Sequence, residues 1–401
     1  MTSSVRLVAD CVAAYAARLH AAVGERHHVA SPLGAWLLLA LAAPASTGQD
    51  RETLTDVLAC DVDTAARAAA ELLADPHPLV AAAAAVWTAH GYTGTLGFQQ
   101  WQAGLPASVT TGDLPSQTDL DRWAGDHTFG LIDRFPVDTE LASLVLATAL
   151  ATKVSWESPF ELAPASSLGP GSRWASQLDR VLRTPDQPRA AHTQFIAAIP
   201  EFADVIVHAA WAVGGLLVIS VAALPDLSAG RVLAAAHDIG RRLATRAPLQ
   251  RRRLDDLPLG EGPLWVLREV EAEADSWSAV LPTWSASTKL DLTDPVLGFA
   301  AAKRGLVGPS EPWAARQAAM ARYSRTGFEA GAVTAFAAGL SARLPSRHRH
   351  RHIELRFGHP YAVVALVQDP ASAWQGLPVF SAWVAEPENA TEDEPGSVRP
   401  L

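Results

Sequence analysis

The residue pattern from 144 to 156 places the strongest constraint on the fold of this chain. Apolar and small residues recur there at every second position: Leu144, Leu146, Thr148, Leu150, Thr152, Val154 and Trp156. A period of two is typical of a β-strand that turns one face toward a hydrophobic core. The pattern therefore predicts one long strand over 144–156, and long strands favour a domain built around large sheets.

Helical periodicity dominates the residues before this strand. Residues 5–19 repeat apolar side chains at helical spacing. Ser31 and Pro32 are typical of a helix start, with serine as the cap and proline in the first turn. The following stretch, 33–43, is apolar on every side, so we expect a fully buried helix. Further helices are predicted at 51–58, 64–73, 120–132, 231–243 and 295–304.

Strand patterns dominate the second half. Besides 144–156, the predicted strands are 202–208, 216–221, 265–270, 277–282, 320–324, 353–357, 362–367 and 378–384. Long strands with helices gathered toward the N-terminus predict a mixed α/β (α+β) fold rather than repeated βαβ units. Residues 388–401 are acidic and contain proline, and we expect a disordered tail there.

Composition excludes several classes of protein. The 401 residues include 32 Lys and Arg against 42 Asp and Glu, a net charge of −10, which argues against nucleic acid as a partner. The longest apolar runs, 33–43 and 212–224, are shorter than the roughly 18 residues that span a bilayer, so we expect no membrane partner. The start of the chain lacks a secretion signal, which favours a soluble cytoplasmic protein.

Cys11 and Cys60 cannot make a disulfide framework, and we expect two buried free thiols.

Common catalytic motifs are absent from the sequence. It contains no G-x-S-x-G, H-E-x-x-H, C-x-x-C, G-x-G-x-x-G or glycine-rich phosphate loop. The 13 histidines are mostly single residues of helices or strands, without a spacing that suits a metal. We therefore expect no cofactor, no metal and no enzyme activity.

Two neighbouring segments are unusual. Residues 326–335 are mostly small and follow a predicted strand. Read with a period of two, they could enter a sheet as a further strand, or form an alanine-rich loop or short helix. Residues 343–352 are rich in arginine and histidine. This second segment could be a solvated loop, a protease-cleavable site, or a patch for a polyanion or a metal.

Six stretches, in this order over residues 5–387, are similar to sequence motifs of the serpin family. They are SPL at 31–33, DRW to GLI at 121–132, LVL to WESPF at 144–160, PTW to LDL at 282–292, FGHPY at 357–361 and PVF to AEP at 378–387. Their order and spacing make the resemblance specific, and the chain looks like a bacterial-type member. The resemblance implies a single domain at 1–387, with about nine helices around three β-sheets and a reactive-centre loop at about 325–352.

The resemblance also implies a function. Inhibitory serpins are suicide-substrate inhibitors of serine, and possibly cysteine, endopeptidases: the loop is cleaved and inserts into the central sheet, which traps the covalent acyl-enzyme. The implied hinge residues are Gly327, Phe328, Glu329, Ala330, Gly331, Ala332, Val333 and Thr334, and the implied sheet-opening residues are Thr148, Trp156 and Gln317. The expected partner is a target serine protease bound by a monomer with a metastable fold. Extracellular function is also compatible with this resemblance.

The sequence departs from the family pattern at the hinge. Arg325 replaces the usual hinge glutamate, and Phe328 stands where the family prefers a small residue. We expect the Phe328 ring to face inward and to limit inhibition, because overpacking opposes insertion. The alternative is a serpin-fold binding protein that does not inhibit and uses its Arg/His-rich loop; a metal-dependent enzyme of another fold is the third reading.

The reactive bond is expected in the loop beyond the hinge. Counting forward from Gly327 gives Ser341-Ala342, and counting back from FGHPY gives Arg349. Arg343-Leu344 is the nearest bond that a trypsin-like protease would cleave. We favour the forward count, because the length of chain before the bond determines how far an attached protease is carried.

Overall fold

The chain divides into two compact units, each made of three chain segments. Unit 1 consists of Met1–Thr152, Ala286–Ala321 and Val364–Ala382, and unit 2 of Lys153–Ser285, Arg322–Val363 and Trp383–Leu401. The computed structural model describes residues 3–92, 94, 96–136, 143–186, 191–199, 202–307, 315–329 and 348–392. Among these residues, no helix has the length and apolar character needed to span a membrane.

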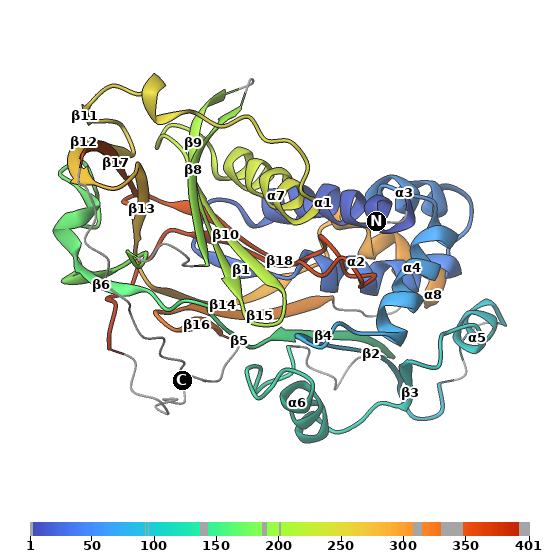
Figure 1. Cartoon of the computed structure of the whole chain (residues 1–401). Coiled ribbons are helices and arrows are strands. Elements are labelled where there is room, and N and C mark those ends of the chain that lie inside the picture. Colours follow the sequence, from blue (N-terminus) through green and yellow to red (C-terminus); the bar gives the residue numbers. More distant parts are fainter. Residues whose placement is uncertain are drawn as a thin grey trace. The chain divides into compact units, whose positions relative to one another are not determined.

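Unit 1 is mainly helical (Figure 1). Its helices are α1 (Ser3–Val23), α2 (Pro32–Ala42), α3 (Gly48–Leu58), α4 (Val62–Ala74), α5 (Leu96–Ala103), α6 (Gln117–Asp126) and α8 (Phe299–Leu306), with short 3-10 turns η1 (Ala43–Ala45) and η4 (Pro295–Leu297). The helices predicted from apolar periodicity are present, but the one expected over 120–132 stops at Asp126. Phe129 and Gly130 take left-handed backbone angles, which a continuing α-helix cannot accommodate.

Helix α2 starts and packs as its sequence indicates. Ser31 is the N-cap, and its Oγ accepts a hydrogen bond from the N–H of Gly34 (3.1 Å). Pro32 occupies the first turn, and all eleven helical residues are buried. A Cβ at Gly34 would lie only 3.3 Å from the Leu150 side chain. Because glycine has no Cβ, the helix can approach strand β4 closely.

A three-stranded sheet of unit 1 has the order β3-β2-β4, formed by β3 (Val109–Asp113), β2 (Val80–Thr88) and β4 (Leu144–Thr152). β2 pairs antiparallel with β4, Val80 opposite Thr152 and Thr88 opposite Leu144, and parallel with β3. The alanine-rich β2 was not predicted as a strand. Alanine favours helices, but pairing along both edges outweighs that preference.

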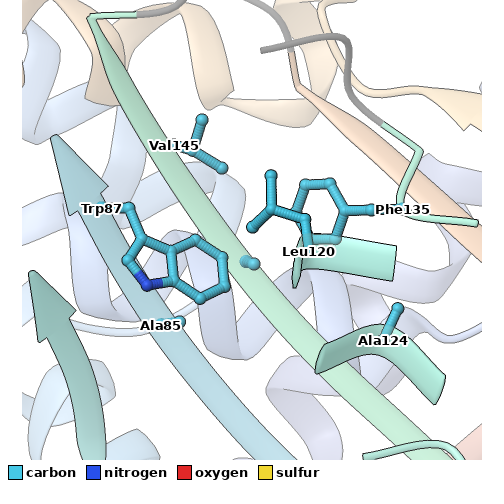
Figure 2. Packing of buried hydrophobic residues seen from close by; sticks show 7 residues of the cluster. Ala85, Trp87, Leu120, Ala124, Phe135 and Val145 are labelled. Carbon is cyan, nitrogen blue, oxygen red and sulfur yellow. The ribbon is translucent and has the colours of Figure 1, made fainter. Parts of the chain in front are cut away.

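Helix α6 covers one face of this sheet. Figure 2 shows side chains of β2 and β4 packed against Leu120 and Ala124 of α6 and against Phe135. Trp87 of β2 meets Trp123 of α6 edge-on, with ring centroids 5.2 Å apart. Within β4, Val145 and Ala147 belong to this cluster, so the alternate residues of the strand belong to its other face.

Unit 2 is mainly β-structure. Its elements are β5 (Val154–Ser155), β6 (Glu161–Pro164), η2 (Ala165–Leu168), β7 (Arg180–Arg183), β8 (His192–Ile199), β9 (Phe202–Ala212), β10 (Leu216–Ala222), α7 (Ala229–Thr245), η3 (Leu254–Asp256), β11 (Gly260–Glu261), β12 (Trp265–Ala272), β13 (Ser276–Leu281), β16 (Gly327–Glu329) and β17 (His348–Arg356). Strands β8, β9 and β10 form an antiparallel meander, and α7 packs beside β10 (Figure 1). A six-stranded sheet has the order β11-β12-β17-β13-β7-β6.

Four strands contribute residues to both units: β14 (Trp284–Asp291), β15 (Arg316–Tyr323), β18 (Tyr361–Val367) and β19 (Pro378–Val384). β15 neighbours β14, and β1 (His28–Ala30) neighbours β19.

The predicted strand over 144–156 is interrupted at Lys153, which separates β4 from β5. Eight α-helices and four sheets occur in the described residues, where about nine helices and three sheets were expected, and the mixed α/β fold is confirmed.

Two predicted boundaries are wrong. Residues 348–352 were expected in a loop, but they begin β17, which pairs antiparallel with β12 and parallel with β13. Residues 388–392 were expected in a disordered tail, but Glu388 donates its N–H to Thr283 (2.7 Å), and Asn389 Oδ1 accepts from the N–H of Asp179 (2.7 Å). Backbone pairing on both sides of β17 and the Asn389 side chain are tertiary contacts that composition does not encode.

Candidate functional site

The predicted hinge begins with a short strand of unit 2. β16 pairs antiparallel with β15, where Tyr323 lies opposite Phe328, and antiparallel with β5, where Val154 lies opposite Phe328. At Gly327 a Cβ would lie 2.4 Å from the carbonyl oxygen of Val154. Only glycine allows this approach. The other predicted hinge residues, 330–334, lie outside the described residues.

The Phe328 ring already has a buried position. Its residue is 2% exposed, and its ring meets that of Trp284 edge-on with centroids 6.3 Å apart. Trp284 in turn stacks on Tyr323, with centroids 6.1 Å apart. The ring thus faces inward in unit 2, within an aromatic group. Whether it limits inhibition stays a prediction.

A tight turn between β15 and β16 holds the start of the hinge. Ser324 Oγ accepts a hydrogen bond from the N–H of Gly327 (3.2 Å). Trp156 Nε1 donates to the carbonyl oxygen of Ser324 (3.0 Å), and its backbone N–H donates to the carbonyl of Thr326 (3.0 Å). The N–H of Phe160 donates to Arg325 O (2.9 Å). Trp156, predicted as a sheet-opening residue, therefore anchors the hinge turn.

A half-buried and a fully buried histidine lie behind this turn in unit 2. Phe160 contacts the ring of Tyr323 and also that of His192, with centroids 5.8 and 4.6 Å apart. His192 Nδ1 and His208 Nε2 share a hydrogen bond of 3.0 Å, and His192 Nε2 donates to the carbonyl of Ser158 (2.8 Å). Burial lowers the pKa of His192 to about 4 and that of His208 well below its usual value. Both rings are therefore neutral at neutral pH.

Within unit 1, β4 and β15 face each other across a cavity. In the described part of the chain, β4 pairs with β2, and β15 neighbours β14 and β16, but no pairing joins β4 to β15. The cavity of about 50 Å³ has walls from α2, the α6 region, β4 and β15. Its lining includes Thr148 and Gln317, and residues from both faces of β4 contribute to it. The two strands are therefore separated by a space that no described strand fills.

Thr148 and Gln317 both reach the start of α2. Thr148 Oγ1 donates to the carbonyl of Gly34 (2.9 Å). Gln317 accepts a hydrogen bond from the N–H of Ser31 (2.9 Å) and donates one to its carbonyl (2.8 Å). Ser31 Oγ donates to the carbonyl of Val379 (2.8 Å). The structure brings these two predicted residues together on one helix end, which side chains of both β4 and β15 reach.

Some residues of the site were missed by sequence reasoning. Ser324 could have been found, because a serine three residues before a glycine is typical of a tight turn. His192 and His208 could not, since their contact depends on the register of β8 against β9, Gln194 lying opposite His208. The chemistry of a single histidine does not reveal its neighbour across a sheet.

The Arg/His-rich segment is partly structural. Arg349 lies in β17 opposite Glu271 and forms an ion pair with Glu269 (3.4 Å), while His350 contacts Asp275 (3.3 Å). These acidic partners reduce the positive charge available to a polyanion. Among the described residues, no group of three or more His, Cys, Asp or Glu could hold a metal ion. The preferred reactive-bond residues, 341–344, lie outside the described residues.

Comparisons with solved structures identify the fold. A cleaved Serpin 42Da is 14% identical over 98% of this chain and 100% of its own, with a TM-score of 0.65. Serpin48 of the insect Tenebrio molitor is 16% identical over 94% and 98%, with a TM-score of 0.58. Human thyroxine-binding globulin, solved in complex with thyroxine, is 12% identical over 96% of this chain and 100% of its own, with a TM-score of 0.65. No family model matches the sequence. No curated protein matches it either.

Proposed function

We propose that this chain, which has the serpin fold, is a suicide-substrate inhibitor of serine endopeptidases. The protease serine attacks the loop bond Ser341-Ala342 or Arg343-Leu344, which leaves an ester to the protease and frees the N-terminus of Ala342 or Leu344. The hinge then enters the sheet between β4 and β15. Insertion of about fourteen residues at 3.3 Å each would move the attached protease by roughly 45 Å and distort it before the ester is hydrolysed.

The register of β16 is the observation that carries this proposal. Phe328 pairs with Val154 of β5, and Glu329 pairs with Arg322 of β15. When both registers are continued, Thr334 falls opposite Thr148 on β4 and opposite Gln317 on β15. A hinge strand that continued both registers would therefore bring its middle opposite the two side chains that reach the start of α2.

The alternation of side chains fits this path. Residues that share the inward face of Phe328 are Ala330, Ala332 and Thr334, which are small enough to lie over α2. The opposite face would carry Gly331 and Val333 toward α6. Since each new backbone hydrogen bond contributes on the order of 1 kcal/mol net, a strand paired along both edges is strongly favoured once it is free to enter.

The same register bears on the reactive bond. The first residue of β4, Leu144, would lie opposite residue 338, so the inserted strand spans the whole of β4 before residue 339 is reached. A bond at Ser341 or Arg343 lies just beyond that point. A bond at Arg349 lies inside β17, where the backbone is already paired with Glu271 of β12 and is less accessible to a protease than a free loop. We therefore retain the forward count.

A protease panel tests the proposal. Purified protein is mixed with trypsin-like, elastase-like and subtilisin-like enzymes, and denaturing gels score covalent complex against simple cleavage. We expect a detergent-stable complex with at least one enzyme, and mass spectrometry of the released peptide should give an N-terminus at Ala342 or Leu344. An N-terminus at His350 would overturn the position of the bond.

A matched pair of variants tests the insertion step. Thr334→Arg places a charge where the inserted strand must be buried, and should convert the inhibitor into a cleaved substrate. Arg349→Ala, an 84% exposed side chain, should leave the complex unchanged. Cleavage of the unaltered protein by every enzyme without complex would overturn inhibition and favour the binding-protein alternative.

A further inference from the structure

The two cysteines of the chain meet at the contact of α1 with the end of α3. Cys11 of α1 donates its thiol hydrogen to the carbonyl oxygen of Ala59 (3.3 Å), and Cys60 is the next residue. Ala59 takes a left-handed backbone angle (φ 56°) that ends α3 and turns the chain there. About two turns further along α1, on the same side of the helix, Arg18 forms an ion pair with Asp56 (2.9 Å). Two separate contacts thus fix α1 against this turn.

The thiols differ in exposure and in acidity. Cys11 is 2% exposed, whereas Cys60 is half-buried, so the expectation of two buried thiols is wrong for Cys60. The Cys11 thiol, bonded to the carbonyl that precedes Cys60, lies next to the second thiol, and this neighbour raises the pKa of Cys11 and lowers that of Cys60. The accessible thiol is therefore the better nucleophile, and the buried thiol reaches the backbone directly before it.

We propose that Cys11 and Cys60 are a redox pair that closes into a disulfide when the protein meets a low-molecular-weight disulfide such as oxidised glutathione. The Cys60 thiolate attacks one sulfur of the reagent and displaces the other as a thiolate. That thiolate takes the proton of Cys11, and the Cys11 sulfur attacks Cys60, which releases the second reagent thiol. The protein loses two electrons and two protons, and one reagent disulfide becomes two thiols.

The disulfide would connect α1 with the turn between α3 and α4. It closes a loop of about fifty residues, and such a loop restricts the unfolded chain more than a short one. Cys11 already contacts the backbone next to Cys60 in the reduced protein, so we expect closure to need little movement of either helix. We expect the oxidised, uncleaved protein to have a thermal midpoint a few degrees higher than the reduced protein, and dithiothreitol to reverse the rise.

The test uses the full chain and oxidised glutathione. After incubation, free thiols are alkylated and the intact mass is measured. We expect both thiols to be lost, a mass decrease of about 2 Da without a glutathione adduct, and a digest peptide that joins Cys11 to Cys60. Two alkylated thiols, a lasting glutathione adduct on the unaltered chain, or a disulfide-linked dimer on a non-reducing gel would each overturn the proposal.

Single variants separate the two roles. Cys11→Ser should stop at a glutathione adduct on Cys60, because no second thiol can displace it. Cys60→Ser should remain unmodified, because its remaining thiol is buried. Equal modification of both variants would overturn the division into an attacking and a resolving thiol. If either variant fails to fold, peptide mapping of the unaltered chain still decides whether the disulfide forms.

Discussion

Gly327 shows how one missing side chain can position a hinge. Its Cα approaches β5 so closely that a Cβ would lie 2.4 Å from the carbonyl oxygen of Val154. Gly327→Ala should therefore push β16 away from β5 and destabilise the protein by about 1–3 kcal/mol. Thermal unfolding measures the loss. Gly112→Ala, in β3, meets nothing within 4 Å and should change the midpoint little; equal effects of the two variants would contradict this reasoning.

Phe328 tests whether a large ring in the hinge restrains inhibition. The ring is buried beside Trp284, so Phe328→Thr should destabilise the uncleaved protein by about 3 kcal/mol. A smaller side chain should also enter the sheet faster, which raises the share of covalent complex over cleaved substrate. The gel ratio measures this share. Phe98 is a buried phenylalanine of α5, and Phe98→Thr should lower stability without changing the ratio of complex to cleaved substrate. An unchanged ratio in Phe328→Thr would mean that the ring does not restrain insertion.

His192 and His208 predict an acid-sensitive stability. The pKa of His192 is lowered from its ordinary 6.5 to about 4 by burial, so the neutral ring is the folded form. The resulting stability is complete above pH 6.5 and decreases as the pH falls from 6.5 to 4, by about 3 kcal/mol for this one group. Thermal midpoints measured over this range should fall less steeply in His192→Gln. His90→Gln, whose side chain is 94% exposed, should keep the original slope; a slope unchanged in both variants would contradict the assignment.

At the scale of elements, the start of α2 is the one place where side chains of β4 and β15 reach the same backbone in the described part of unit 1. Thr148 reaches Gly34, and Gln317 reaches Ser31 on both its N–H and its carbonyl. These contacts hold the two strands without a backbone ladder between them. Strands held in this way can separate at the cost of a few hydrogen bonds, whereas a paired ladder would have to be broken along its length.

A cysteine pair tests the proposed register of the inserted strand. Thr148→Cys and Thr334→Cys, combined with Cys11→Ser and Cys60→Ser, should form a disulfide after loop cleavage and not before. Residues directly opposite in an antiparallel pair have Cβ atoms about 5 Å apart, close enough for a disulfide after a small shift. Non-reducing gels detect the link. Val333→Cys in place of Thr334→Cys points to the other face and should not link; equal linking would contradict the register.

At the scale of the whole molecule, the proposed function requires a native state that gains stability on cleavage. The hinge beyond β16 could add a strand, but in the uncleaved chain its far end is attached to β17, which is paired on both sides. Cleavage between residues 340 and 349 should therefore raise the thermal midpoint strongly, because the new ladder forms without unfolding. Calorimetry before and after quantitative cleavage measures the rise.

The Thr334→Arg variant is the control for this effect. The same cut in that chain should produce little or no rise, since the charged side chain opposes burial of the strand. A midpoint that stays unchanged after cleavage of the unaltered protein would contradict a metastable native state. A rise of equal size in both chains would mean that the gain comes from some source other than insertion.

The sequence by itself determined the type of most long elements and the class of fold. An uninterrupted apolar stretch specified the buried helix α2, because the helix has no polar side chains to form a solvent-exposed face. Alternation specified β4, because side chains of a strand point to opposite faces in turn. The order of motifs between 31 and 387 was enough to identify the serpin fold. These properties are encoded locally, in the spacing of neighbouring residues.

Only the tertiary structure decided which distant residues meet. The alanines of β2 are a strand because β3 and β4 flank them. The arginines and histidines from 348 are a strand because they pair with β12, and β13 joins on the other side from His352. The contacts of Thr148 and Gln317 with α2, the His192–His208 pair and the Cys11–Cys60 pair depend on strand register and helix packing. Such contacts join residues far apart in the chain, and their energy arises only when burial and pairing elsewhere have brought the backbones together.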